Sequence, residues 1–312
     1  MVSYAKITSS QDTPYYFNFG TGESSWQRSW QRSWQLTEVM ADRLSDEPVS
    51  FNAIEARTRE FTALRGEHRD LKYQPTRFTG CNPAIEIDKY LREMGKEPYN
   101  KKIIELNLSK CRVNNMALLT HFPNLTSLNI SGNGISPMEV QVISDPRSGL
   151  TSLDISGNGI SSEEAQAITD SLRRLTRLTH LDIGGNDIGD DGAKAICGLI
   201  NLISLNICEN WIGPNGIQDI SNMTKLTHLD ISDNTIGDDG VKAISKIKGL
   251  IYLDIVENNI GPEGAKAISD PVHGLKNLMH LNIKYNQIGE EGAKAISKMK
   301  KLTSLDIDPE AI

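Results

Sequence analysis

The chain of 312 residues has no apolar run close to the ~20 residues that a membrane-spanning helix needs. The sequence therefore predicts no transmembrane segment. The opening stretch, MVSYAKITSSQDTPYY, holds one Lys and no apolar core, so we expect no cleaved secretory signal there.

Cysteine is scarce, and its spacing carries no known chemistry. The four cysteines, Cys81, Cys111, Cys197 and Cys208, lie far apart and lack the paired spacing of a zinc site. They indicate reduced thiols in a reducing compartment, which favours a cytoplasmic protein. The sequence also lacks a phosphate-binding glycine loop and a Ser–His–Asp pattern. We therefore predict no cofactor, no bound metal and no catalytic residue, and so no enzyme.

Basic residues are in deficit, and the deficit lies in one part of the chain. The net charge is −7. Residues 1–98 hold 13 basic and 14 acidic residues, whereas the remainder holds 20 basic and 26 acidic. An acidic surface repels phosphate backbones, so this balance argues against nucleic acid as a partner and favours a neutral or basic one.

The sequence is rich in one repeated motif. The template L-x-x-L-x-L/I-x-x-N matches fully seven times, with spacings of 24 to 28 residues between its final asparagines. These asparagines are Asn133, Asn158, Asn186, Asn210, Asn234, Asn258 and Asn286. A first copy has Cys111 in the final slot, and a last copy over 302–307 breaks off before that slot. About nine repeats therefore occupy residues 99–312.

Each position of the repeat has a physical reason. The Leu and Ile side chains point inward because one repeat cannot bury them alone, whereas stacked repeats build a continuous core. The inward Asn bonds backbone groups that the loop leaves unpaired, so we predict a structural role for it and for Cys111. The segments between the predicted strands, such as IGDDGVKAISKI, have apolar residues at helical spacing. This spacing predicts a strand, a turn and a helix in each repeat.

This pattern resembles that of the leucine-rich repeat family, in its ribonuclease-inhibitor-like subtype, over roughly residues 100–312. The resemblance implies an α/β fold, a right-handed solenoid or horseshoe. Its concave face would carry a parallel β-sheet, and its convex face would carry the helices. Residues 99–312 then form the repeat domain and residues 1–98 a separate region.

The variable residues of the strands are the candidates for binding on the concave face, because strand side chains alternate between the two faces. Their middle column is an Asp and Asn ladder, which is interpreted either as a solvated polar face or as a docking stripe for a cationic protein. Histidines alternate with other residues in the first column, about 10 Å apart, which is too far for two ligands of one zinc ion. The candidates from these columns are His180, Asp182, His228, Asp230, Tyr252, Asp254 and His280.

Two further aromatic residues stand where the template needs none. Trp211 follows Asn210 where other repeats have Gly, Asp, Thr, Asn or Gln. Tyr285 precedes Asn286 where others have Gly, Glu or Asp. Large aromatic side chains that the core does not need are candidate anchors for a partner, although local packing is the alternative.

The first 98 residues lack the repeat and predict a small helical region that caps the first strand. Helices are expected over residues 50–69 and 83–95. Trp26, Trp30 and Trp34 recur at steps of four, which would form one stripe on a helix. The stripe is interpreted as packing within this region, with a groove for a partner helix and an interfacial membrane anchor as alternatives.

The function that these features favour is a non-enzymatic, monomeric, protein-binding scaffold. The repeats resemble those of effector proteins of intracellular bacterial pathogens such as Legionella. That resemblance implies export by a specialised secretion system, a host-protein partner and action in the host cytoplasm. One alternative is the substrate-recognition part of a ubiquitin-ligase-type enzyme, although Cys81-Asn82-Pro83 lacks the Asp that follows the catalytic Cys of such ligases. A second alternative is self-association through the last strand.

Overall fold

The computed structural model describes residues 4–8, 14–18, 23–26, 70–73, 91, 92, 96, 101, 103–113 and 115–308. The chain divides into two compact units. The first contains Met1–Asn133 with Arg147–Leu150, and the second contains Gly134–Pro146 with Thr151–Ile312.

The first unit contains both antiparallel and parallel strands. Its elements are β1 (Tyr4–Thr8), β2 (Pro14–Asn18), β3 (Glu23–Trp26), β4 (Asp70–Tyr73), β5 (Ile103–Asn107), the 3₁₀-helix η2 (Met116–His121) and β6 (Ser127–Asn129). Strand β1 pairs antiparallel with β2 and with β4, whereas β4, β5 and β6 pair in parallel. The edge of β5, which the sequence predicted to need a cap, is thus hydrogen-bonded to β4.

The expected helical character of residues 1–98 needs correction where the structure describes them. Strands β1 to β4 form instead, because segments such as YAKIT and PYYFN are rich in the β-branched and aromatic residues that favour strands. Trp26 ends strand β3, while Trp30, Trp34 and the expected helix over 50–69 lie outside the described residues. Of the expected helix over 83–95, Leu91 and Arg92 are described, and both are helical.

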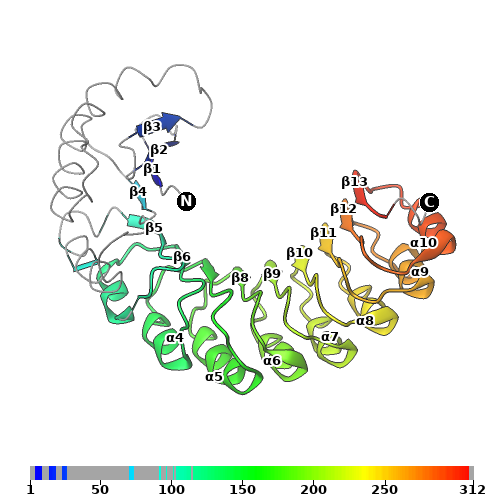
Figure 1. The fold of residues 1–312 in the computed structure, drawn as a ribbon, viewed down its shortest axis with the longest axis horizontal. Coiled ribbons are helices and arrows are strands. Elements are labelled where there is room, and N and C mark those ends of the chain that lie inside the picture. Colours follow the sequence, from blue (N-terminus) through cyan, green and yellow to red (C-terminus); the bar gives the residue numbers. More distant parts are fainter. Residues whose placement is uncertain are drawn as a thin grey trace. The chain divides into compact units, whose positions relative to one another are not determined.

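The second unit alternates strands with short helices, as the sequence predicted. Its helices are α4 (Pro137–Ile143), α5 (Ser162–Leu172), α6 (Gly189–Ile196), α7 (Pro214–Ile220), α8 (Gly237–Ile244), α9 (Pro262–Ser269) and α10 (Gly289–Ile296). Its strands are β7 (Ser152–Asp154), β8 (His180–Asp182), β9 (Ser204–Asn206), β10 (His228–Asp230), β11 (Tyr252–Asp254), β12 (His280–Asn282) and β13 (Ser304–Asp306). The strands line the inner, concave side of this unit and the helices line its outer side (Figure 1). The predicted α/β solenoid is confirmed.

The strands of the second unit pair in parallel and in register, so equivalent residues of successive repeats stand side by side. The central leucine of each strand from β7 to β12 is at most 2% exposed. In β13 the equivalent Leu305 is 39% exposed. The core therefore follows the predicted aliphatic positions and thins at the last described repeat.

The asparagine ladder has the structural role that the sequence predicted. Asn234 is 5% exposed, and its Nδ2 donates to the carbonyl oxygens of Ile207 at 3.1 Å and Ile231 at 3.0 Å. Its Oδ1 accepts the N–H groups of Asn210 at 3.2 Å and Ile212 at 2.8 Å. One amide thus bonds backbone groups of two successive repeats, which would otherwise be buried and unpaired.

In the part of the chain that the structure describes, no helix is both long and apolar enough to cross a membrane.

Candidate functional site

The first side chains of the strands form one row on the concave face of the second unit. The register places Tyr252 between His228 and His280. The rings of His228 and Tyr252 stack with centroids 6.0 Å apart, and the centroids of Tyr252 and His280 lie 6.4 Å apart. Both histidines are exposed, and Tyr252 is half-buried. The three rings therefore form a continuous surface over β10, β11 and β12.

His180 lies in the same row and is separated from His228 by Ser204. The Nδ1 atom of His180 lies 2.9 Å from Thr179 Oγ1, and that of His228 lies 2.8 Å from Thr227 Oγ1. These threonines orient the two imidazoles in the same way. Among the described residues, no three His, Cys, Asp or Glu side chains are arranged to hold a metal ion.

The second row consists of Asp and Asn side chains that close the ends of the strands. Asp182 Oδ1 accepts the N–H of Gly184 at 3.0 Å, and Asp230 Oδ1 accepts the N–H of Ser232 at 3.0 Å. Asp254 makes the equivalent bond at 3.2 Å. One oxygen of each of these aspartates therefore bonds the backbone two residues on, a structural role that neither interpretation of the ladder foresaw.

The carboxylates of this row are partly buried. Burial raises the pKa of Asp182 and of Asp254 above the ordinary range, because desolvation disfavours the charged form. Hydrogen bonds oppose the shift. Asn206 Nδ2 donates to Asp182 Oδ2 at 3.1 Å, and Asn282 Nδ2 donates to Asp254 Oδ2 at 3.0 Å. The row is a hydrogen-bonded polar surface more than a set of freely solvated charges.

The described cysteines are poor nucleophiles. Burial, followed by the nearby carboxylates of Asp230 and Asp182, raises the pKa of the Cys208 thiol to about 12. Burial raises the pKa of Cys111 to about 11. Since the thiolate is the reactive form, both side chains stay protonated and inert at neutral pH. Cys81, on which the ligase alternative rests, lies outside the described residues.

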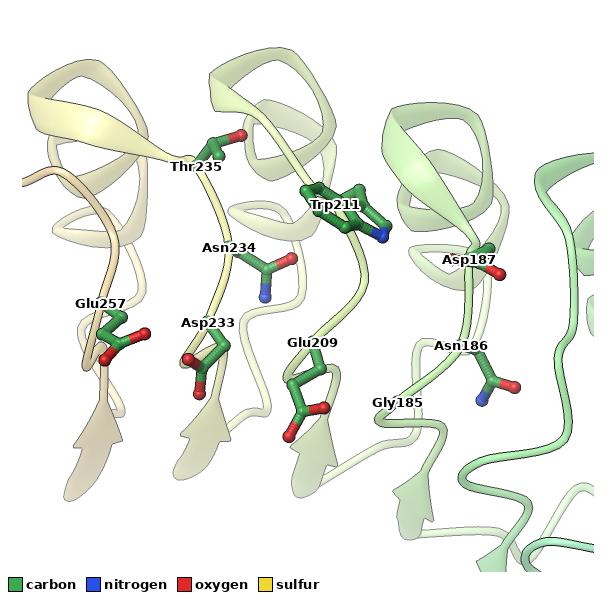
Figure 2. A pocket seen from close by; sticks show the side chains of 9 residues that line it. All are labelled: Gly185, Asn186, Asp187, Glu209, Trp211, Asp233, Asn234, Thr235 and Glu257. Atoms are coloured by element: carbon green, nitrogen blue, oxygen red, sulfur yellow. The ribbon is translucent and has the colours of Figure 1, made fainter.

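A pocket of about 470 Å³ lies at the carboxyl ends of strands β8 to β11, where the chain leaves the sheet for the helices (Figure 2). Its volume falls within the range of small-molecule and side-chain binding pockets. The residues that line it are Gly185, Asn186, Asp187, Glu209, Trp211, Asp233, Asn234, Thr235 and Glu257. They come from four successive repeats, so the parallel register alone brings them together.

The indole of Trp211 forms an apolar wall of this pocket and is 76% exposed. Trp211 has a φ of +57°, a left-handed conformation that costs a bulky residue free energy. Gly134 and Gly159 occupy the same slot in earlier repeats, also with positive φ. The fold thus accepts strain here to keep a tryptophan in a position that packing does not require.

Three acidic residues of the pocket, like Trp211, have positive φ at a slot that holds glycine in other repeats. Glu209, Asp233 and Glu257 occupy consecutive repeats with φ of 50° to 54°, where Gly157 and Gly185 stand in the repeats before them. Figure 2 shows their carboxylates in a row beside the strand ends, with Trp211 farther along the loops toward the helices. The Asp233 carboxyl raises the pKa of Glu257, first through a side-chain hydrogen bond and then through the repulsion of like charges. The lining contains four acidic residues and no basic one.

The structure separates the predicted site residues into two groups. The concave rows hold His180, Asp182, His228, Asp230, Tyr252, Asp254 and His280. Trp211 and Tyr285 lie on the loops beyond the strands, and Tyr285 is 64% exposed. Of all nine, Trp211 lines the pocket. Sequence reasoning missed the pocket acids, although acidic residues at a slot that takes glycine elsewhere were a usable signal.

Comparison with known proteins agrees with this architecture. The Leucine Rich repeat family matches residues 122–137, 150–168, 175–197, 222–245, 250–269 and 274–297. The structure of internalin C2 from Listeria monocytogenes is similar, with 22% identity and a TM-score of 0.47 over 61% of this chain and 74% of that one. The leucine-rich repeat-containing protein LegL7 from Legionella pneumophila has 20% identity and a TM-score of 0.50 over 76% of this chain and 90% of that one. No curated protein matches the chain significantly.

The repeats and their stacking define a class of protein, the leucine-rich-repeat solenoids. The present chain has that fold, and its repeats match the Leucine Rich repeat family over the ranges given above.

Proposed function

We propose that this protein is a non-enzymatic scaffold that binds another protein through the concave face and the adjoining loop edge of its second unit. The leucine-rich-repeat fold supports a binding role in general, because stacked repeats create an extended surface that the core does not use. The residues proposed to contact the partner are those of the concave rows together with Trp211 and Tyr285.

The observation that carries the proposal is the exposure and backbone conformation of Trp211 at the edge of the pocket. A tryptophan that is 76% exposed, holds a left-handed backbone conformation and borders a pocket contributes nothing to the core. Large aromatic side chains are the usual anchors of protein interfaces, where their burial supplies much of the binding energy. The stacked rings of His228 and Tyr252 extend the aromatic surface along the concave face.

The chemistry of the described residues supports binding over catalysis. The thiols of Cys111 and Cys208 have raised pKa values and are not activated. The partly buried Asp182 and Asp254 spend one oxygen each on the backbone. An acidic, aromatic surface of this kind suits a partner with a neutral or basic face.

We further propose that the partner is a host-cell protein. In this proposal the chain is a monomeric effector of the ribonuclease-inhibitor-like subtype, exported by a bacterium and acting in the host cytoplasm. Support comes from the resemblance of the repeats to those of effectors, and from the helix in each repeat of the second unit. An affinity capture from host lysate, read by mass spectrometry, supplies the candidate partner for a direct binding measurement.

The binding proposal is tested by the double variant Trp211→Ala with Tyr252→Ala. We expect the dissociation constant for the purified partner to rise at least about 30-fold, since loss of an anchor costs about 2 kcal/mol or more. The matched control is Met138→Ala on α4, another exposed apolar residue, which is 74% exposed. Equal affinity of wild type and double variant for the partner would contradict the proposal.

A further inference from the structure

The pocket beneath Trp211 combines an aromatic wall with an excess of negative charge. None of the ion pairs found among the described residues involves Asp187, Glu209, Asp233 or Glu257. All four side chains are exposed. The described residues therefore supply no cation to this cavity, although they pair acidic residues elsewhere, for example Glu291 with Lys266 at 2.7 Å.

The arrangement of the carboxylates selects between kinds of cation. Successive repeats stand about 4.8 Å apart, so Glu209, Asp233 and Glu257 form a row, while Asp187 lies farther along the loop, in the slot that Trp211 has in the next repeat (Figure 2). In agreement with this, the described residues contain no cluster of three or more acidic, His or Cys side chains able to hold a metal ion. A spread of acceptors suits a planar, delocalised cation better than a compact divalent ion.

Trp211 further restricts the kind of cation that would suit this pocket. A guanidinium group stacks on an indole face through cation–π attraction and donates in-plane hydrogen bonds to carboxylates at the same time. The lining offers both partners, since Trp211 shares the cavity with Glu209 and Asp233. A cavity of about 470 Å³ has room for a whole side chain and its hydration.

We propose that this pocket receives an arginine side chain of the partner protein, with Trp211 stacking on the guanidinium and Glu209 and Asp233 accepting its hydrogen bonds. The inference rests on the proposed binding function and names the chemistry that the partner presents. The arginine is the occupant because the cavity has an aromatic wall, four carboxylates and no basic residue of its own.

The test uses the full chain and a defined probe. Nα-acetyl-arginine amide is titrated into ¹⁵N-labelled protein while the indole N–H resonance of Trp211, assigned with Trp211→Phe, is followed. We expect a saturable shift in the millimolar range. Nα-acetyl-citrulline amide, which has the shape of arginine without its charge, should leave the resonance unmoved.

Charge-removing variants locate the effect. E209Q together with D233N should raise the dissociation constant of the arginine probe at least threefold. E163Q together with E290Q removes two exposed charges outside the pocket lining and should leave the binding unchanged. Equal shifts with arginine and citrulline, or equal weakening by both variant pairs, would overturn the proposal. An equal response to Nα-acetyl-lysine amide would overturn the choice of arginine.

This experiment fails independently of the binding proposal. If the arginine probe does not bind, while the variant Trp211→Ala with Tyr252→Ala loses affinity for the partner, the binding proposal is supported and the proposed arginine pocket is wrong. If the probe binds and the partner affinity is unaffected by that double variant, the pocket binds a guanidinium group, but the proposed interface is wrong and the occupant is not an arginine of that partner.

Discussion

The carboxylate of Asp238, in the first turn of α8, accepts the backbone N–H of Gly261, the N-cap residue of α9 in the next repeat, at 2.7 Å. It also accepts the N–H of Gly264 at 2.9 Å. Asp190 makes the same bond to Gly213 at 2.7 Å. The first Asp of each IGDDG segment thus caps the helix of the following repeat, which has IGPxG in the same place. Neighbouring repeats are therefore joined through their helices as well as through their strands.

We expect Asp238→Ala to lower the free energy of unfolding by about 1–2 kcal/mol, because two N–H groups at the start of α9 lose their acceptor. Asp239→Ala is the matched control, since Asp239 is exposed and forms a surface ion pair with Lys242 at 2.9 Å. Such pairs contribute about 0–1 kcal/mol. Urea unfolding followed by circular dichroism measures both, and an equal loss in the two variants would contradict the capping role.

The buried asparagines should matter far more for stability than the exposed residues beside them. Asn234→Ala removes the acceptor for two backbone N–H groups and the donor for three carbonyl oxygens. We expect a loss of about 3 kcal/mol or more, because each unpaired buried group costs about 1–3 kcal/mol. Thr235→Ala, at the exposed neighbouring position, should lose under about 1 kcal/mol. Thermal unfolding of both variants decides the matter.

Trp211 offers a direct test of retained backbone strain. Trp211→Gly should raise the free energy of unfolding by up to about 1 kcal/mol, because glycine adopts φ of +57° without a steric penalty. Trp211→Ala removes the same indole but keeps a Cβ, so we expect it to gain less. Both variants should lose partner affinity. If alanine and glycine proved equally stable, the left-handed conformation would not be a source of strain.

The partly buried carboxylate of Asp182 predicts a pH-dependent effect of Asp182→Asn. The folded protein raises the pKa of Asp182 above the unfolded value of about 3.9. The stability that this residue contributes is therefore present below the unfolded pKa and lost as pH rises through the folded pKa. We expect the variant to gain stability relative to wild type over that interval and to show a constant difference above it.

The measurement is chemical denaturation of wild type and Asp182→Asn at intervals from about pH 3 to pH 7. Asp219→Asn, outside the strands, is the comparison, because Asp219 lies on α7 away from the buried row. A stability difference for Asp182→Asn that falls with rising pH would contradict the direction of the shift.

Much of the second unit was predictable because the repeat obeys local rules that recur along the chain. The spacing of Leu and Ile determined which side chains are buried, and Leu253 and Ile255 are both fully buried as expected. The Asn slot predicted hydrogen bonds to the loops, which Asn234 makes. The positions of Trp211 and Tyr285 outside the core also followed from the alignment of the repeats, since both are exposed.

The first unit shows where sequence reasoning was weaker. Without a repeat, short segments such as residues 4–8 and 14–18 gave no strong periodicity, and we expected a helical region with helices over 50–69 and 83–95. Strands form there, and β1 pairs with the distant β4. Pairing between segments more than sixty residues apart depends on tertiary contacts that local propensity does not encode.

The sequence by itself determined the repeat, its buried ladder and the identity of the side chains that face outward, because each follows from the requirement to bury one face of a short unit. The tertiary structure decided which outward side chains meet. It placed Glu209, Trp211 and Glu257 around one cavity, and it committed an oxygen of Asp182 to the backbone. The physical reason is that stacking holds successive repeats at the spacing of neighbouring strands. Residues of different repeats can line one pocket only when the repeats are held at that spacing.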